Sequence, residues 1–474
     1  MPKRAYRLAT DSPEIVAAFA ELRRQLKVSL QFPAEVLGEA ETAAHNPRLP
    51  NADETAIPFV TLDPAASMDL DQAFHIERRG DGYRVRYAIA DVAAFVKPGG
   101  PMDVEAHERG ETLYAPDENA RLYPPAISEG AASLLPDQTR PAVVWTMDVD
   151  ETGEGVDVNV RHALVRSRAK LDYVTSQQEL DGGTADEQLR LLREVGLLRQ
   201  QREVRRGGVS LAIPEQVITE DDGHYGLQFR APLPVEGWNA QISLMTGMAA
   251  ADLMLKGGVG LLRTVPLADP DRLQRLRLTA RALNVEWPED VPYPAFVRSL
   301  SPFIARQAAL LLEAASLLRG SSYTWFEDVP PEQPTHSALA STYAHTTAPL
   351  RRLVDRYVGE ACIALSDGRE VPDWVREELP KLPEVMAKSG GRAGQYEAGI
   401  VSILEAALLE ERVGETFDAI VVELHERRGG ATIAIRQPSV VARCRGENLP
   451  LGGRIRARLD EVDVMRRLVR FEAV

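Results

Sequence analysis

The stretch "TLDPAASMDLDQAFHIERRGDGYRVRYAIADV", residues 61–92, carries the clearest structural signal in the chain. Its second half is rich in β-branched and aromatic residues on both sides of a Gly-Asp-Gly turn, which is typical of a β-hairpin. The apolar run "IPFVTL" at 57–62 predicts another strand just before it. Asp63, Asp69 and Asp71 lie between that strand and the hairpin. We therefore expect an acidic cluster where the hairpin begins.

These three aspartates are close enough in sequence to act together. Asp69 and Asp71 are two positions apart, so in an extended segment their side chains leave on the same side, and Asp63 can fold back toward them. Clustered carboxylates repel one another unless a cation neutralises them, and their oxygens suit Mg²⁺ or Mn²⁺. Each aspartate taken alone has an alternative role as a turn cap. A calcium loop fits poorly, because Ala73 and Phe74 stand where that motif needs an acidic or amide residue and glycine.

A second group of reactive side chains lies in "ASTYAHTTAPLRRLVDR", residues 340–356. His345, the hydroxyl of Thr347 and the paired Arg351 and Arg352 crowd a segment that passes from turn to helix. Hydroxyls and arginines at the start of a helix are suited to gripping phosphate. The alternative is a capped helix start with solvated arginines and an ordinary loop histidine.

Tyrosines stand out in the loop-like segment "RGETLYAPDENARLYPP", residues 109–125. Tyr114 and Tyr123 are flanked by prolines and turn residues. Exposed tyrosines in such a segment can stack on nucleic-acid bases. The alternative is that they pack against the neighbouring prolines.

Net charge at first argues against a nucleic-acid partner, since the chain of 474 residues carries -15 and phosphate contacts come from Lys and Arg. The distribution weakens that objection, because the segment from Glu411 to the end holds 12 Arg against 10 acidic residues. No apolar stretch is long enough to span a membrane and none resembles a signal peptide, so we expect a cytoplasmic protein without a membrane partner. Cys362 and Cys444 are expected to be thiols rather than a disulfide.

Periodicity divides the chain into three parts. Helices are predicted within 11–28, where Ser12 is the expected cap, and over 33–44. Strands dominate the next part and give way to helices further along, and after Gly414 five short strands separated by turns suit a small oligonucleotide-binding (OB) barrel. We therefore predict a multidomain α+β protein, with an N-terminal helical module that has a helix-turn-helix-like arrangement as one alternative, a mixed α and β body, and a C-terminal barrel. The predicted boundaries are 1–50, 51–410 and 411–474.

Several motifs together resemble a known family. They are "TLDPAASMDLDQAF", "YAIADVAAFV", "RGETLYAPD", "ASLLPDQTRPAVVWTMDVD", "RAKLDY" and "YAHTTAPLRRLVD". Their order and spacing resemble the catalytic RNB domain of the RNase II and RNase R family, and the tail resembles the S1 domain of that family. The resemblance extends over about 52–474 and is patchy between 180 and 335. Residues 1–50 are too few for the two cold-shock domains that usually precede this catalytic domain.

The resemblance implies an activity and a metal site. It implies a processive exoribonuclease that hydrolyses single-stranded RNA from the 3′ end to nucleoside 5′-monophosphates with Mg²⁺, for which Mn²⁺ is an alternative. Asp63 and Asp69 match aspartates that organise the metal site, and Asp71 matches the one most critical for cleavage. The usual fourth aspartate is Gln72 here, whose carbonyl oxygen is expected to coordinate the metal without adding charge.

Roles in RNA binding also follow from the resemblance. Arg351 matches the arginine that steadies the scissile phosphate and is expected to be catalytic together with the aspartates. Tyr114 matches the tyrosine that holds the 3′-terminal end and sets the length of the final product, and Tyr173 matches one that lines the RNA path. With His345, Thr347 and Arg352 of the phosphate-gripping segment, these residues form the expected RNA-binding set. The expected assembly is a monomer that needs no nucleotide cofactor.

Two other functions have sequence support of their own. An RNA-binding relative with weak or lost catalysis is one alternative, because Gln72 removes a charge from the metal site. Read alone, "DLD" also matches the metal-binding Asp-x-Asp of nucleotide-sugar transferases. That second alternative explains neither the arginine-rich tail nor "TAPLRR", so the exoribonuclease is the leading hypothesis.

Overall fold

The predicted strand and hairpin are part of a closed five-stranded barrel. The computed structural model describes residues 8–211, 215–302, 304–425 and 429–474. The barrel has the strand order β2-β3-β4-β5-β6 and comprises β2 (Phe59–Asp63), β3 (Gln72–Arg79), β4 (Gly82–Ala90), β5 (Thr139–Val149) and β6 (Gly155–Asp172). The alternating pattern fills its interior with large side chains, among them the fully buried Phe74, Tyr87 and Trp145. The barrel closes where β2 runs parallel to β6 and Asp63 pairs with Asp172.

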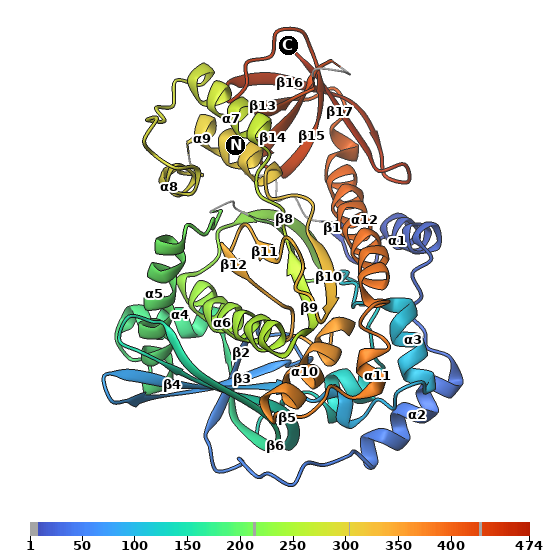
Figure 1. Cartoon of the computed structure of the whole chain (residues 1–474). Helices are drawn as coiled ribbons and strands as arrows, with labels where there is room; N and C mark the ends of the chain where they lie inside the picture. The colour runs from blue at the N-terminus through green and yellow to red at the C-terminus, as the bar shows by residue number, and fades with distance from the viewer. Residues whose placement is uncertain (1–7, 212–214, 303, 426–428) are drawn as a thin grey trace.

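Helices cover this barrel on one side (Figure 1). The central one is α6 (Pro234–Gly257), which packs between α5 (Glu187–Arg206) and α10 (Leu353–Ser366). Buried residues occur all round α6, as expected for a helix enclosed by other elements rather than lying on the surface. The end of β2, the start of β3 and the start of α10 therefore meet beneath α6.

One long helix connects the body to the C-terminal barrel (Figure 1). This is α12 (Leu382–Leu409), and the N-terminal α1 (Pro13–Leu26) packs along it. The predicted apolar face of α1 is buried there, and Leu22 sits so close to Gly399 that an added Cβ would lie 2.8 Å from its side chain. The predicted cap is wrong in detail, because the Ser12 side chain makes no capping hydrogen bond and Pro13 begins the helix without it.

The remaining elements surround these parts. A three-stranded sheet has the order β1-β8-β7, which joins the start of the chain to a hairpin between α5 and α6. Its strands are β1 (Leu8–Ala9), β7 (Glu215–Asp221) and β8 (His224–Arg230). The short strands are β9 (Val259–Thr264), β10 (Ser322–Glu327), β11 (Thr335–His336) and β12 (Ser341–Thr342). The other helices are α2 (Ala34–His45), α3 (Pro101–Arg109), α4 (Tyr173–Gly182), α7 (Pro270–Ala282), α8 (Tyr293–Ser299), α9 (Ala305–Ser316) and α11 (Asp373–Arg376), with the single turns η1 (Val92–Ala94), η2 (Ala126–Ala131) and η3 (Glu410–Arg412).

The predicted C-terminal OB-type barrel is confirmed. Its closed order is β13-β14-β15-β17-β16, formed by β13 (Thr416–Leu424), β14 (Ala431–Arg436), β15 (Ser439–Arg445), β16 (Arg454–Asp463) and β17 (Leu468–Ala473). Phe417 and Phe471 meet edge to face in its core. Cys362 and Cys444 are buried free thiols, as expected. Across the described ranges, every helix is too short or too polar to cross a bilayer.

A buried ion-paired histidine ties the catalytic barrel to α10. His162 on β6 places Nδ1 2.8 Å from Asp91 Oδ2 and Nε2 3.3 Å from Glu360 Oε1 on α10. Although burial opposes the charge, the two carboxylates raise the pKa of His162 to about 10. The three side chains are the one set of three potential metal ligands within 4.8 Å of one another in the described residues. The imidazolium already supplies the positive charge between the two carboxylates.

We expect the contribution of His162 to stability to depend on pH. Because its pKa is higher in the folded chain than in the unfolded one, the stabilisation is full below the unfolded value of about 6.5 and is lost as pH rises through about 10. The melting temperature of His162→Gln should therefore fall further below that of the wild type at pH 6 than at pH 10. The exposed His45→Gln is the control, and an equal deficit at both pH values for His162→Gln would contradict the ion-paired state.

Candidate active site

The loop that carries the aspartates is held by side chains from two other motifs. Asp63 is the last residue of β2, and Asp69 and Asp71 lie in the loop from 64 to 71. Lys170 of "RAKLDY" donates to the carbonyls of Ala65 and Ser67 at 2.7 and 2.5 Å. These bonds leave the loop little freedom. Sequence reasoning quoted that motif but missed Lys170, since its role depends on carbonyls more than a hundred positions away.

Ser133 of "ASLLPD" fixes the next part of the same loop. Its hydroxyl donates to the Met68 carbonyl at 2.6 Å and accepts from the Leu70 amide at 3.0 Å. Because Leu70 lies between Asp69 and Asp71, these bonds set the direction in which both carboxylates leave the chain. Ser133 also escaped the sequence analysis.

Asp71 joins the acidic loop to the distant phosphate-gripping segment. Its side chain is buried, with 4 % of the residue exposed. Oδ1 accepts from the Leu350 amide at 2.8 Å, and Oδ2 lies 3.5 Å from Arg351 Nε. The two segments predicted to carry the chemistry therefore meet at one carboxylate.

The carboxylates lie in surroundings that lack positive charge. Burial raises the pKa of Asp71 well above its ordinary value, although Arg351 and the Leu350 amide oppose the shift. Burial also raises the pKa of Asp63 to about 6, with Asp69 adding to the effect and Arg351 opposing it. No described residue donates a hydrogen bond to Asp63. This set of oxygens fits a hard divalent cation, which would remove the cost of three nearby negative charges.

The three carboxylates are neighbours without forming a closed cage. They are absent from the sets of three ligand atoms within 4.8 Å of one another in the described parts of the chain. Mg²⁺ usually keeps several water molecules and takes only a few protein ligands, so an open arrangement of this kind suits it.

The two arginines of "TAPLRR" have different partners. Arg352 makes a bidentate pair with Asp355 at 2.5 and 2.8 Å, and Asp355 also accepts from the Ala348 amide at 2.7 Å. Arg352 is thereby engaged in holding its own loop. Arg351 keeps half of its side chain exposed and is the arginine available to a phosphate.

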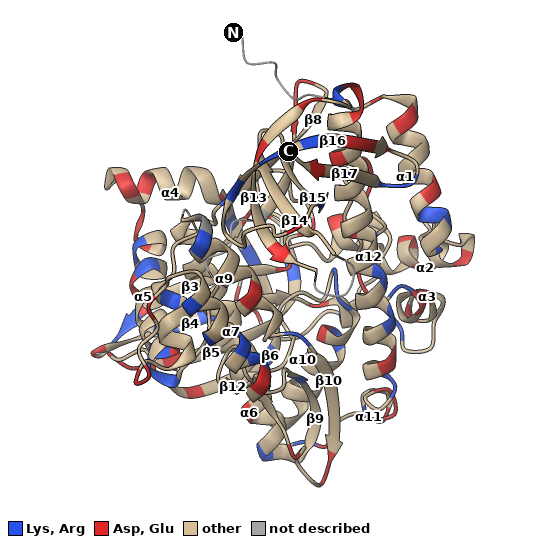
Figure 2. Cartoon of the chain, turned by 90° about the horizontal axis from the view of Figure 1, so that it is seen from above, with Lys and Arg blue, Asp and Glu red and all other residues tan. Residues whose placement is uncertain are grey.

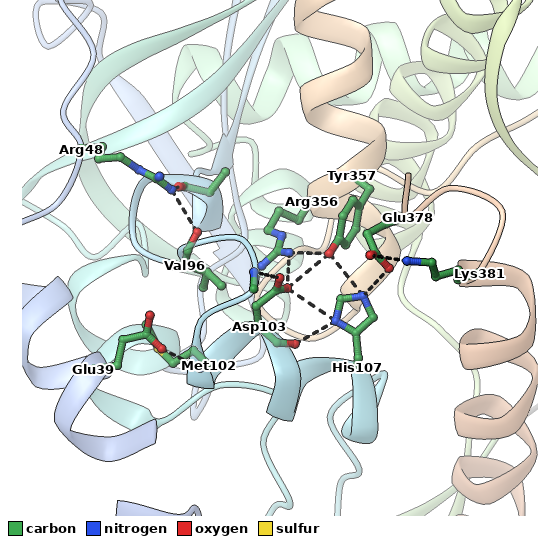
Figure 3. Close-up of polar contacts among 12 residues, drawn as sticks. Glu39, Arg48, Val96, Met102, Asp103, His107, Arg356, Tyr357, Glu378 and Lys381 are labelled. Carbon is green, nitrogen blue, oxygen red and sulfur yellow. Dashed lines mark hydrogen bonds and ion pairs between the residues drawn. The ribbon is translucent and has the colours of Figure 1, made fainter. Parts of the chain in front are cut away.

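The first turns of α10 are anchored by a buried ionic network (Figure 3). Arg356, with 1 % of its side chain exposed, pairs with Asp103 of α3. The hydroxyl of Tyr357 donates to Asp103 at 3.2 Å and lies 3.3 Å from Nε2 of His107. His107 in turn lies 3.4 Å from Glu378. Because α10 follows Arg351 and Arg352 directly, these contacts fix where the arginines begin.

The predicted tyrosines separate into exposed and buried positions. Tyr114 remains 47 % exposed, and its hydroxyl donates to Asp69 Oδ2 at 3.0 Å. Tyr123 is fully buried, so the packing alternative is right for that residue. Tyr173 is partly buried and accepts a hydrogen bond at 3.1 Å from Asn239 of α6. Tyr114 therefore offers an open ring face beside the aspartates.

His345 and Thr347 are engaged within the protein. The hydroxyl of Tyr323 lies 2.6 Å from Nδ1 of His345, and the ring of Tyr343 meets it edge-on. Burial lowers the pKa of His345 well below its ordinary value, so the imidazole is neutral. Thr347 is buried, and its hydroxyl lies 2.8 Å from that of Ser243 on α6. Their contact with RNA stays a prediction.

Gln72 uses both ends of its amide inside the protein. Nε2 donates to the Thr347 carbonyl at 2.6 Å, and Oε1 accepts from the Tyr87 hydroxyl at 2.5 Å. Its predicted role as a metal ligand therefore competes with an existing contact at the carbonyl oxygen.

A cavity of about 970 Å³ opens on this site. Its wall includes Tyr114, Arg351 and Arg352 together with residues of the β7–β8 hairpin and α12. On the C-terminal barrel, Arg454, Arg456 and Arg458 alternate with buried or half-buried apolar residues along β16, which places the arginines on the solvent face (Figure 2). The chain thus combines an acidic site, an arginine and a wide cavity with an exposed basic strand.

A barrel domain that carries buried aspartates and an arginine, joined by a long helix to an OB-type barrel, defines a nucleic-acid-processing class of protein. Comparison with known families gives the particular family. The RNB domain matches residues 52–365, and the RNase II-type exonuclease C-terminal S1 domain matches residues 415–474. The chain belongs to the RNase II and RNase R family.

Named relatives agree with this assignment. The chain is 26% identical over 437 residues to "Ribonuclease R" of Vibrio cholerae, covering 85% of this chain and 52% of the relative. It is 24% identical over 414 residues to "Ribonuclease R" of Escherichia coli, covering 82% and 50%. The chain thus spans about half the length of these curated relatives.

Solved structures share the fold. RNase R of Mycoplasma genitalium in complex with ribose methylated single-stranded RNA has a TM-score of 0.86 at 19% identity, with 98% of this chain and 78% of that chain covered. Yeast Ssd1, described as a pseudonuclease, has a TM-score of 0.72 at 16% identity, with 95% and 57% covered.

The buried pair of Arg352 and Asp355 should matter far more to stability than an exposed pair on the same helix. Asp355→Ala leaves a buried guanidinium without its partner, and we expect the free energy of unfolding to fall by about 3 kcal/mol or more. Asp367→Ala, which breaks the exposed pair with Arg369, should cost less than about 1 kcal/mol. Urea denaturation measures both, and equal losses would contradict the structural role of Asp355.

Proposed function

We propose that this protein is a processive 3′-to-5′ exoribonuclease that hydrolyses single-stranded RNA to nucleoside 5′-monophosphates. The observation that carries the proposal is the meeting of Asp71, Leu350 and Arg351, which brings a buried carboxylate and an available guanidinium to one cavity. Family membership supports it, as do relatives named Ribonuclease R. Single-stranded RNA is the proposed partner, and the proposed assembly is a cytoplasmic monomer without a nucleotide cofactor.

Asp63, Asp69 and Asp71 are the proposed ligands of Mg²⁺, with Mn²⁺ as an alternative ion. When bound, the ion activates water and neutralises phosphate charge. The raised pKa values of Asp63 and Asp71 support a cation at this place, because burial without one penalises their ionised forms.

The chain's own residues supply the rest of the proposed mechanism. Arg351, next to Asp71, donates hydrogen bonds to the scissile phosphate and stabilises charge that develops in the transition state. Tyr114 stacks on the 3′-terminal base, and its hydroxyl bond to Asp69 ties the position of that base to the acidic loop. The cavity holds the 3′ end of the strand, and the barrel with its arginines holds the part further upstream.

A second candidate function is RNA binding without efficient cleavage. Two observations favour it: Gln72 brings no charge to the acidic cluster, and a pseudonuclease shares the fold. Such a protein would retain Arg351 and Tyr114 as RNA contacts and release no nucleotide.

Degradation of labelled RNA distinguishes the two candidates. With 5′-labelled single-stranded RNA and Mg²⁺, the wild type should give a descending ladder that ends in a short oligonucleotide. Asp71→Asn should lower the rate by about a hundredfold or more, because it removes the buried negative charge at the centre of the site, while RNA still binds. Asp181→Asn, at the exposed end of α4, is the matched control and should keep the wild-type rate.

Other outcomes would contradict the proposed activity. Internal cuts would indicate an endonuclease. Binding without nucleotide release in either Mg²⁺ or Mn²⁺ would establish the second candidate. A rate that is unchanged by Asp71→Asn would remove the aspartate cluster from the mechanism.

Tyr114 should set the length of the final oligonucleotide through its ring. Tyr114→Ala removes the stacking surface, and we expect the limit product to lengthen by at least one nucleotide. Tyr114→Phe keeps the ring and loses only the bond to Asp69, so its limit product should match the wild type. Denaturing gels of exhaustive digests measure both, and a longer product from Tyr114→Phe would assign the effect to the hydroxyl instead.

A further inference from the structure

We propose that Gln72 is a positioning residue, which fixes the segment 344–352 that carries Arg351 rather than ligating the metal. We call this segment the 344–352 loop. The inference rests on the proposed function in one respect, since it gives the loop its role in holding the scissile phosphate. The contacts that carry it are independent of any reaction.

The orientation of the Gln72 amide follows from its two partners. The Thr347 carbonyl can only accept a hydrogen bond, so the amide atom 2.6 Å from it is the nitrogen. The oxygen then faces the hydroxyl of Tyr87, which donates at 2.5 Å. A reversed amide would set two acceptor oxygens against each other at the loop.

Gln72 and Asp71 together hold the loop at two points of its main chain. Asp71 accepts from the Leu350 amide, and Gln72 donates to the Thr347 carbonyl. These neighbouring residues carry opposite hydrogen-bonding groups, an acceptor and a donor, matched to a main-chain N–H and a C=O three positions apart. The remaining supports of the loop are Asp355 beneath Ala348 and Ser243 beside the Thr347 hydroxyl.

An aspartate at position 72 would not replace this contact. Its side chain is one methylene shorter than that of glutamine, and an ionised carboxylate has no proton to donate to a carbonyl. A carboxylate would also add a negative charge beside Asp71, whose ionised form burial already disfavours. The neutral amide therefore serves the loop at a place where a fourth acid would serve only a cation.

Tyr87 completes the connection from the barrel interior to the loop. It is 1 % exposed and lies on β4, on the strand that pairs with β3 throughout. Its hydroxyl holds the Gln72 oxygen and so restricts rotation of the amide. The oxygen that would have to bind a metal is the one that this buried hydroxyl occupies.

The test compares two glutamines on the two sides of the same strand. Gln72→Met removes the donor and the acceptor at nearly constant volume. Gln188→Met is the matched control, because the Gln188 amide also makes two hydrogen bonds to β3, with the N–H and C=O of Ile76, far from the loop. The full chain is used for three measurements: hydrogen exchange of the 344–352 loop, affinity for single-stranded RNA in EDTA, and affinity for Mn²⁺ in the absence of RNA.

If Gln72 positions the loop, Gln72→Met should speed exchange in the 344–352 loop by about tenfold and weaken metal-free RNA binding by about tenfold, as expected for one lost hydrogen bond to a buried carbonyl. Its Mn²⁺ affinity should stay within about twofold of the wild type. Gln188→Met should alter neither the loop nor RNA affinity. Tyr87→Phe should produce a smaller rise in exchange in the same loop, and this variant provides the test should Gln72→Met fail to fold.

The opposite pattern would overturn the proposal. A metal ligand at position 72 would show as a fall in Mn²⁺ affinity for Gln72→Met with unchanged exchange and unchanged RNA binding in EDTA. Failure of the proposed nuclease activity is a separate result, because it would appear in the wild type as absence of nucleotide release. The exchange measurement needs neither RNA nor metal and remains decisive in that case.

Discussion

The hydrogen bond from the Leu350 amide to the buried carboxylate of Asp71 is the interaction on which the site depends. It joins residues 279 positions apart, and it brings Arg351 beside the aspartates. A buried carboxylate is costly unless its lone pairs are used, so the structure must close around it. The acidic loop and the phosphate-gripping segment each have their own supports, and this carboxylate is where the two sets meet.

Those supports are buried polar contacts rather than surface pairs. Lys170 and Ser133 hold the acidic loop through main-chain carbonyls, and Asp355 holds the distant segment through Arg352 and Ala348. Beneath them, Arg356 and Asp103 anchor the helix that follows. Buried networks of this kind are worth little as net stabilisation, yet breaking one leaves an unpaired charge or donor. Their value here is a defined position for Arg351.

Local pattern was sufficient for the parts of the fold that pair with near neighbours. The hairpin of β3 and β4 followed from its alternation and its turn, and the C-terminal barrel from short strands between turns. The buried face of α1 followed from its spacing. Local pattern did not separate Tyr114 from Tyr123, which share one motif and differ only in what covers them. Nor did it show that His345 lies among tyrosines.

The sequence by itself determined which chemical groups this protein has and the order in which they occur, because residue types and strand or helix periodicity are local properties. Tertiary structure alone decided which of those groups are free to act. Arg351 is available and Arg352 is paired, although they are neighbours of the same type. Gln72, read as a missing charge, is engaged by Thr347 and Tyr87. The physical reason is that availability depends on burial and on hydrogen-bond partners contributed by segments far away in the chain.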